Sequence, residues 1–111
     1  MRIENTKLTC PDCGGAIEKL EEEKLTQYRC RVGHLYSPVS ALSVHAEREE
    51  NTLWTAVVLL QEGADLADEI ASLVTTREPQ QLRDAAKAKH KLAEQVRTIV
   101  SEFERISLGL E

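Results

Sequence analysis

The chain has 111 residues, of which 41% are hydrophobic and 30% are charged, and its formal net charge is −5. This length suffices for one domain, or for a small module with an extension. The charge content favours long exposed helices, and the 4% of aromatic residues leaves any core aliphatic. The acidic balance argues against nonspecific nucleic-acid binding, which requires a basic face.

The location of the protein is inferred from features that its sequence lacks. Residues 1–9 contain no apolar stretch of the kind that forms a signal peptide. No run of about 18 apolar residues occurs, so we expect no transmembrane helix. An odd number of cysteines, all gathered in one metal-like motif, fits the reducing cytosol. We therefore expect a cytoplasmic protein that does not contact a membrane.

The strongest motif in the chain consists of Cys10, Cys13, Cys30 and His34. These residues form two close pairs, C-P-D-C-G-G and C-R-V-G-H, separated by a spacer of sixteen residues. Such spacing is typical of a zinc ribbon, since a short loop with two ligands supplies one edge of a tetrahedron. The pattern predicts a structural Zn²⁺ site in which the protein fills all four coordination positions.

The spacer between the two pairs predicts a β-hairpin. Residues 16–20 and 25–30 alternate in polarity on either side of a polar turn, and residues 1–9 suggest a further short strand. Unusual backbone angles are expected at the glycines of the ligand loops, which are Gly14, Gly15 and Gly33. A ribbon over residues 1–36 is too small to fold on aliphatic burial alone. Metal binding is therefore expected to supply much of its folding free energy.

A long amphipathic helix is predicted from Pro38 to about Thr75. Ser37 is a good N-cap, and proline is favoured at the first helical position. Gly63 weakens the helix and marks a bend or a close crossing. The apolar positions that recur at threes and fours are Leu42, Ala46, Leu53, Ala56, Leu60, Ala67, Ile70 and Val74.

A second helix is predicted to begin at Pro79. Its apolar seam follows a heptad pattern with one polar member, and consists of Leu82, Ala85, Lys89, Leu92, Val96, Ile99, Phe103 and Ile106. The short connection makes the two helices antiparallel neighbours. This hairpin pairs Val74 with Leu82, Ala67 with Lys89, Leu60 with Val96, and Leu53 with Phe103. The stem of Lys89 is expected to lie along Ala67, with its ammonium group in water.

These elements predict a small α+β fold with a zinc ribbon at residues 1–36 and an antiparallel helical hairpin at residues 37–109. Residues 110–111 are set aside as a candidate vector scar. More apolar side chains lie off the first helix's seam than one partner helix covers: Trp54, Val57, Val58, Leu59, Leu66 and Leu73. We expect them to bind a second copy, completing a helical bundle, or a signalling protein through the Trp54/Val57/Val58 face.

Three segments carry a resemblance to a known family: C-P-D-C-G-G, Y-R-C-R-V-G-H-L-Y-S-P and L-W-T-A-V-V-L-L-Q-E. They resemble the zinc-ribbon and helical segment at the C-terminus of some bacterial chemotaxis methylesterases (CheB-type), over roughly residues 8–75. The resemblance implies a bacterial cytoplasmic setting and a signalling context. It does not imply esterase activity, because this chain has no room for the catalytic domain of those proteins. The apolar run at residues 57–60 departs from the family pattern and favours self-association.

The favoured function is therefore a non-catalytic zinc-binding interaction module in chemotaxis or two-component-type signalling. One alternative is a nucleic-acid-binding ribbon, with Arg29 and Arg31 on phosphates and Tyr28 and Tyr36 on bases. Equal numbers of acidic and basic side chains in residues 1–36 weigh against it. The other alternative is a zinc–thiolate redox sensor, in which oxidation of the cysteines releases the metal.

The remaining histidines are interpreted as surface residues. His45 and His90 each precede a glutamate by four residues, Glu49 and Glu94, so each pair shares a helix face. His45 is also an alternative fourth zinc ligand, if the first helix folds back onto the ribbon. His34 is the preferred ligand, because its short loop to Cys30 requires no such contact.

Overall fold

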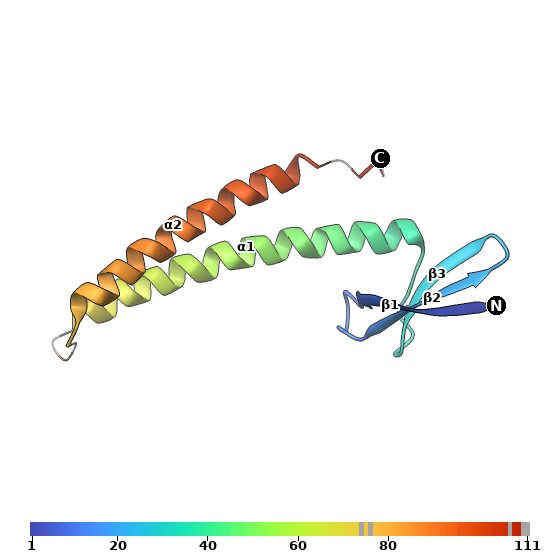
Figure 1. Ribbon diagram of the computed structural model, residues 1–111, viewed down its shortest axis with the longest axis horizontal. Helices are drawn as coiled ribbons and strands as arrows, with labels where there is room; N and C mark the ends of the chain where they lie inside the picture. The colour runs from blue at the N-terminus through green and yellow to red at the C-terminus, as the bar shows by residue number, and fades with distance from the viewer. Residues whose placement is uncertain (74, 76, 107, 110–111) are drawn as a thin grey trace. The chain divides into compact units, whose positions relative to one another are not determined.

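The computed structural model describes residues 1–73, 75, 77–106 and 108–109. Four strands are followed by two helices, which confirms the predicted α+β class. Figure 1 labels β1, β2, β3, α1 and α2. The elements are β1 (Arg2–Thr9), β2 (Ala16–Glu22), β3 (Leu25–Cys30), β4 (Leu35–Tyr36), α1 (Pro38–Ala71) and α2 (Pro79–Glu104). The chain forms two compact units, Met1–Glu49 and Glu50–Leu108, and α1 begins in the first and continues into the second.

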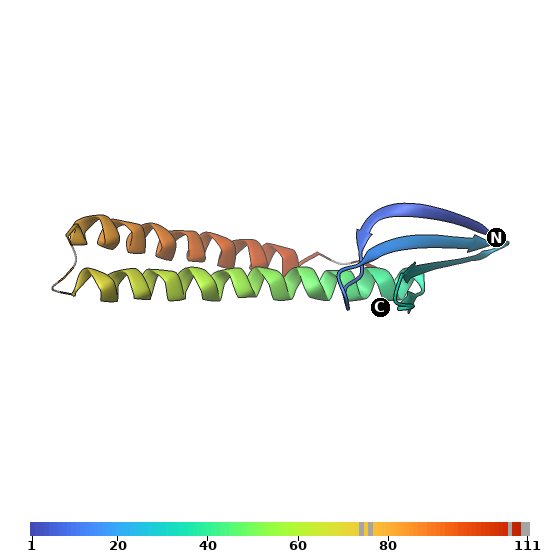
Figure 2. The same ribbon diagram turned by 90° about the horizontal axis from the view of Figure 1, so that it is seen from below.

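The strands of the first unit form one antiparallel sheet in the order β1-β2-β3-β4. Figure 2 shows strands of this sheet in blue to blue-green. The predicted hairpin of β2 and β3 is confirmed, with Ile17 opposite Cys30 and Glu22 opposite Leu25. Between Asn5 and Thr9 the β1–β2 register shifts. At this irregularity the Thr6 hydroxyl donates a hydrogen bond to the Ile17 carbonyl at 2.7 Å, which satisfies a backbone group that the ladder leaves open.

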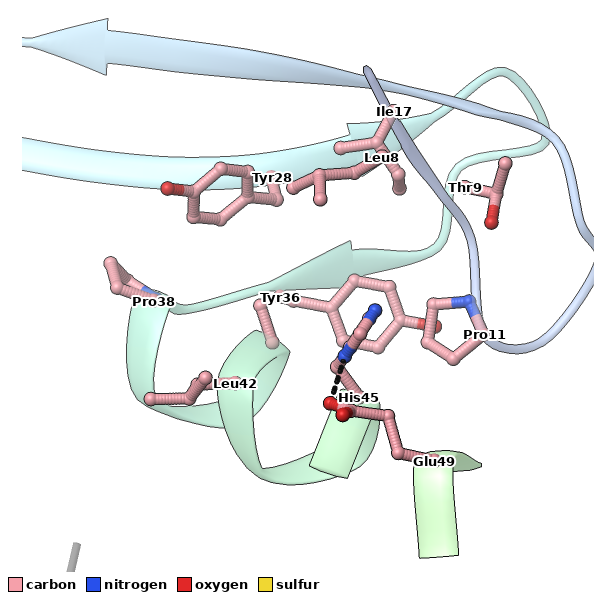
Figure 3. Close-up of a pocket in the computed structure, with 11 residues that line it drawn as sticks. Leu8, Thr9, Pro11, Ile17, Tyr28, Tyr36, Pro38, Leu42, His45 and Glu49 are labelled. Atoms are coloured by element: carbon pink, nitrogen blue, oxygen red, sulfur yellow. Dashed lines mark hydrogen bonds and ion pairs between the residues drawn. The ribbon is translucent and has the colours of Figure 1, made fainter. Parts of the chain in front are cut away.

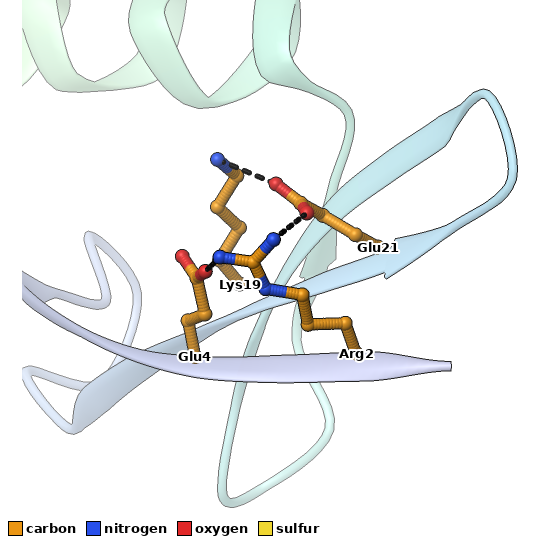
Figure 4. Close-up of polar contacts among 4 residues, drawn as sticks. All are labelled: Arg2, Glu4, Lys19 and Glu21. Carbon is orange, nitrogen blue, oxygen red and sulfur yellow. Dashed lines mark ion pairs between the residues drawn. The ribbon is translucent and has the colours of Figure 1, made fainter.

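One face of the sheet carries a cross-strand ion-pair network on β1 and β2 (Figure 4). Arg2 pairs with Glu4 and, at 3.8 Å, with Glu21, while Lys19 Nζ lies 2.7 Å from a Glu21 carboxylate oxygen. The hydrogen bond from Lys19 lowers the pKa of Glu21, and the same bond raises the pKa of Lys19. Opposite charges on neighbouring strands stabilise this register of the two strands.

The apolar core of the first unit is small. Cys10, Ile17 and Cys30 are buried together, and the partly buried rings of Tyr28 and Tyr36 pack against them. Two of the three buried members are thus cysteines rather than aliphatic residues. Because so little aliphatic surface is buried, packing alone gives the sheet weak support.

The predicted start of α1 is confirmed. The Ser40 N–H donates to Ser37 Oγ at 3.1 Å, so Ser37 caps the helix one residue before Pro38. The predicted end near Thr75 is wrong, since α1 ends at Ala71. After that residue, Ser72 N–H and Leu73 N–H bond the carbonyls three residues back, which tightens and closes the last turn. The β-branched residues that follow in the sequence offer little to extend it.

The second unit packs α1 against α2 through small side chains. Ala64, Ala67 and Ala86 form its buried cluster. The buried positions of the two helices are Val57, Ala64, Ala67 and Ala71 on α1, and Ala86, Ala93 and Val100 on α2. Helices that meet through alanine approach closely, so the backbone itself contributes to the contact.

The seam predicted from the sequence is wrong at several positions. Val57, expected on an exposed face, is only 1% exposed, whereas Ile70, expected in the seam, is 39% exposed. On α2, Leu92 and Ile99 are about half exposed, at 48% and 49%. The physical reason is that alanines form the closest line of contact between the helices, and the larger residues at neighbouring positions are turned outward.

The antiparallel pairing is supported by three contacts in the second unit. A Cβ at Gly63 would lie 3.4 Å from Lys89 Cδ, so the missing side chain at Gly63 makes room for that of Lys89. The stem of Lys89 therefore lies over Gly63, whereas Ala67 was the predicted neighbour. The Arg97 guanidinium lies 6.0 Å from the centroid of the Trp54 ring, and His90 Nε2 lies 3.7 Å from Asp65 Oδ1. The predicted pairing of Val74 with Leu82 lies outside the described residues.

Removing the cation beside Glu21 tests the ion-pair network. Lys19→Met is expected to return the pKa of Glu21 toward its ordinary value of 4.5. Because the folded-state pKa is lowered, the stabilisation is present above the ordinary pKa and is lost as the pH falls through the lowered value. An NMR titration of the Glu21 carboxyl measures the change, with Lys24→Met in the turn as control. Equal Glu21 pKa values in both variants would contradict the assigned pair.

Enlarging an alanine in the helix seam tests the close packing. Ala86→Leu inserts a larger side chain where Ala64 and Ala67 leave no space, and is expected to destabilise the hairpin by about 1–3 kcal/mol. Thermal unfolding followed by circular dichroism measures the loss. Lys87→Leu adds a leucine at the neighbouring exposed position and should unfold near the wild-type temperature. If the two variants unfold alike, the seam lies elsewhere.

Candidate metal centre

The first ligand loop connects β1 to β2 and carries Cys10 and Cys13. The Gly14 N–H donates to the Cys10 carbonyl at 2.8 Å, and the Cys10 N–H donates to the Gly15 carbonyl at 2.7 Å. Gly14 has a φ of 74°, in the left-handed region that favours glycine. The two hydrogen bonds fold the loop back on itself, so that both thiols lie on the same side of it.

The second ligand loop connects β3 to β4 and carries Cys30 and His34. The Gly33 N–H donates to the Cys30 carbonyl and the Cys30 N–H to the His34 carbonyl, each at 3.1 Å. Gly33 has a φ of 102°, which confirms the expected unusual angle. The expectation was wrong for Gly15, whose φ is not positive; there, a Cβ would come within 3.4 Å of Cys13 Sγ.

The two loops bring all four predicted ligands together, with their donor atoms within 4.8 Å of one another. The Sγ atoms of Cys13 and Cys30 are 3.7 Å apart, and His34 Nδ1 lies 3.6 Å from Cys10 Sγ and 3.3 Å from Cys30 Sγ. A tetrahedron with Zn–S bonds of about 2.3 Å and Zn–N bonds of about 2.0 Å has S–S edges of about 3.8 Å and S–N edges of about 3.5 Å. The four residues could therefore hold a metal ion of this size.

The ring of His34 presents Nδ1 to the thiols, so Nδ1 is the nitrogen placed to act as ligand. Cys10 and Cys30 are buried, His34 is half-buried, and Cys13 is exposed. The cluster therefore has one solvent-facing thiol and three donors that lie deeper in the unit.

Polar groups around the cluster orient Cys10. Its Sγ lies 3.5 Å from the Tyr36 hydroxyl, which donates a hydrogen bond to the Asp12 carboxylate. These two contacts raise the pKa of Tyr36, the one with Asp12 having the larger effect. Arg48 Nη1 donates to the Cys10 carbonyl at 3.5 Å, and so connects α1 to the first ligand loop. Groups of this kind fix the orientation of metal ligands.

The thiols differ in their acidity. Burial raises the pKa of Cys10, but the contact with the Tyr36 hydroxyl and hydrogen bonds from the N–H groups of Cys13 and Asp12 lower it to about 6. At Cys13, the Gly15 N–H lowers the pKa, but burial and the two neighbouring thiols outweigh it and raise the pKa. Neighbouring thiolates thus repel one another, and a bound cation would relieve that repulsion.

The other histidines lie apart from the cluster. His45 Nδ1 is 2.7 Å from Glu49 Oε1, which confirms that these residues share a helix face, and His45 is not among the grouped donors. His90 pairs across the hairpin with Asp65. The sequence did not reveal the roles of Tyr36, Asp12 and Arg48, because their contacts depend on how β4 and α1 fold back toward the first loop.

A cleft of about 420 Å³ lies beside the ligand loops within the first unit (Figure 3). The sheet forms one wall and the first turns of α1 form the other. Its lining is largely apolar and consists of Leu8, Thr9, Pro11, Ile17, Tyr28, Tyr36, Pro38, Ala41, Leu42, His45 and Glu49. The sequence did not predict this cleft, since its residues come from β1 to α1 and share no motif.

Among the described residues, neither helix combines the length and the apolar content that a membrane crossing requires. Comparison of the chain with known protein families, with curated proteins and with solved structures finds no match.

Proposed function

We propose that this chain is a non-catalytic interaction module whose N-terminal sheet is folded around a structural Zn²⁺ ion. The observation that carries the proposal is the convergence of Cys10, Cys13, Cys30 and His34 at the edge lengths of a tetrahedral zinc site. Three thiolates and one imidazole form a donor set that binds zinc in preference to harder cations.

The number of protein ligands favours a structural role over a catalytic one. Four protein donors complete a tetrahedron, whereas catalytic zinc sites keep one position for water or substrate. When bound, the ion would supply a cross-link between the β1–β2 loop and the β3–β4 loop. Structural zinc in small domains is worth about 10–16 kcal/mol of binding free energy, which also stabilises the fold.

The setting of the module is proposed from its resemblance to the C-terminal segment of chemotaxis methylesterases. The ordered segments around Cys10, Cys30 and Trp54 carry that resemblance. They favour a role in bacterial chemotaxis or two-component-type signalling in the cytoplasm. There, a zinc ribbon and a helical hairpin would serve to bind other protein surfaces.

Exchanging each of two histidines of the first unit tests the ligand set. His34→Ala removes the only nitrogen donor of the cluster and is expected to abolish stoichiometric zinc binding. His45→Ala is the matched control, because His45 contacts Glu49 instead of the thiols. Native mass spectrometry of untreated protein should find one zinc per chain in the wild type and in His45→Ala. Zinc loss in His45→Ala alone would identify His45 as the ligand.

Removing a buried thiol tests whether the metal holds the sheet. Cys30→Ser is expected to unfold residues 8–36, because the cross-link supplies most of their stability. The hairpin of the second unit should remain helical, because the residues of its buried cluster all belong to that unit. Amide NMR spectra distinguish the two units. Dispersed signals from β2 and β3 in this variant would contradict a structural metal.

A further inference from the structure

We infer that the helical hairpin of one chain packs against that of a second copy, through a single face with an apolar centre, to form a four-helix bundle. This inference concerns the second unit, Glu50–Leu108, and does not depend on the proposed metal. It names both the surface and its occupant. The surface differs from the Trp54/Val57/Val58 face expected from the sequence, since Val57 is buried between the helices.

The face consists of large apolar side chains that neither helix covers. They are Leu59, Leu66 and Leu73 on or just after α1, and Leu92, Ile99 and Ile106 on or just after α2. Their exposed fractions run from 48% to 62%. They recur at steps of seven on both helices, so on each helix they form one stripe.

Contacts across the hairpin place both stripes on the same side. The pairs Asp65–His90 and Trp54–Arg97 mark one side of the seam. Successive residues of an α-helix are about 100° apart, so the stripe on α1 lies away from Asp65 and Trp54. By the same rotation the stripe on α2 lies away from His90 and Arg97. The two stripes therefore share the opposite side and together make one face.

The composition of this face favours contact with a copy of itself. Toward the seam between the helices, its positions carry small residues: Ala56, Gly63, Ala85 and Ala88. Three carboxylates, Glu62, Glu69 and Glu102, lie at its outer edge, each three residues after a leucine or isoleucine of the face. The apolar centres of two such faces can meet while these carboxylates stay at the rim in water. Lys89 lies nearer the seam, since its Nζ would lie 3.3 Å from a Cβ at Gly63. A single polar residue in a helical seam lowers stability but specifies register.

The size of the face matches what a stable dimer buries. The 26 residues of α2 extend over about 39 Å. Two helices whose axes are about 9 Å apart present a width of about 20 Å. The resulting area, on the order of 800 Å², is the share that each partner contributes to an interface of standard size. A single helix from another protein would cover only part of that width, whereas a second hairpin covers it all.

Molar mass in solution tests the inference on the full chain. Light scattering after size exclusion should give twice 12.4 kDa for the wild type. Leu66→Glu and Ile99→Glu place a carboxylate in the face and are expected to weaken association by about a hundredfold or more, giving 12.4 kDa particles. Both positions are exposed in a single hairpin, so circular dichroism should find its helicity unchanged.

Val58→Glu is the matched control. Val58 is as exposed as Ile99, at 49%, but it lies toward the Trp54 side of α1. This variant should keep the dimer mass. A monomeric wild type, or dimer loss in Val58→Glu with retention in Leu66→Glu, would overturn the inference. Since Cys30→Ser leaves the hairpin intact, that variant should remain dimeric, so failure of the zinc proposal and failure of this one are distinguishable.

Discussion

The meeting of the two ligand loops is the constraint on which the first unit depends. The β1–β2 loop brings Cys10 and Cys13, and the β3–β4 loop brings Cys30 and His34, to within 4.8 Å of one another, with three donor pairs at 3.3–3.7 Å. In the sheet, Cys10 and Cys30 are buried with Ile17 where larger domains have an aliphatic core. A cation at this point would connect two loops at the same end of the sheet and neutralise thiolates that otherwise repel one another.

The second unit is stabilised by a different interaction. Its helices meet through Ala64, Ala67 and Ala86, where small side chains permit a close approach. This packing leaves most of the large apolar residues of the hairpin outside its own seam. The hairpin therefore has a packed seam between α1 and α2, and it also has a second apolar surface that is exposed and can bind a partner. The two units thus differ in what they bury, since the first buries cysteines and the second buries alanines.

Local chemistry made part of this structure predictable. Ligand spacing identified the two loops, and Ser37 with Pro38 marked the start of α1, because both signals act within a few residues. The seam of the helical hairpin was harder to predict. Hydrophobicity favoured Leu92 and Ile99 as seam residues, whereas Ala93 and Val100 are the residues buried there. The contact between Tyr36 and Cys10 could not be predicted, because these residues lie far apart in the sequence and no local pattern indicates that they meet.

The short passage from sheet to helix has a consequence for cooperativity. β4 ends at Tyr36 and α1 begins at Pro38, so only Ser37, the N-cap, separates them. Starting a helix is the costly step, because the first turn fixes several backbone dihedrals for one hydrogen bond. A rigid ribbon with the cap already in position lowers this nucleation cost. Order at the metal centre therefore propagates along the backbone into the first turns of α1, the part of that helix that belongs to the first unit.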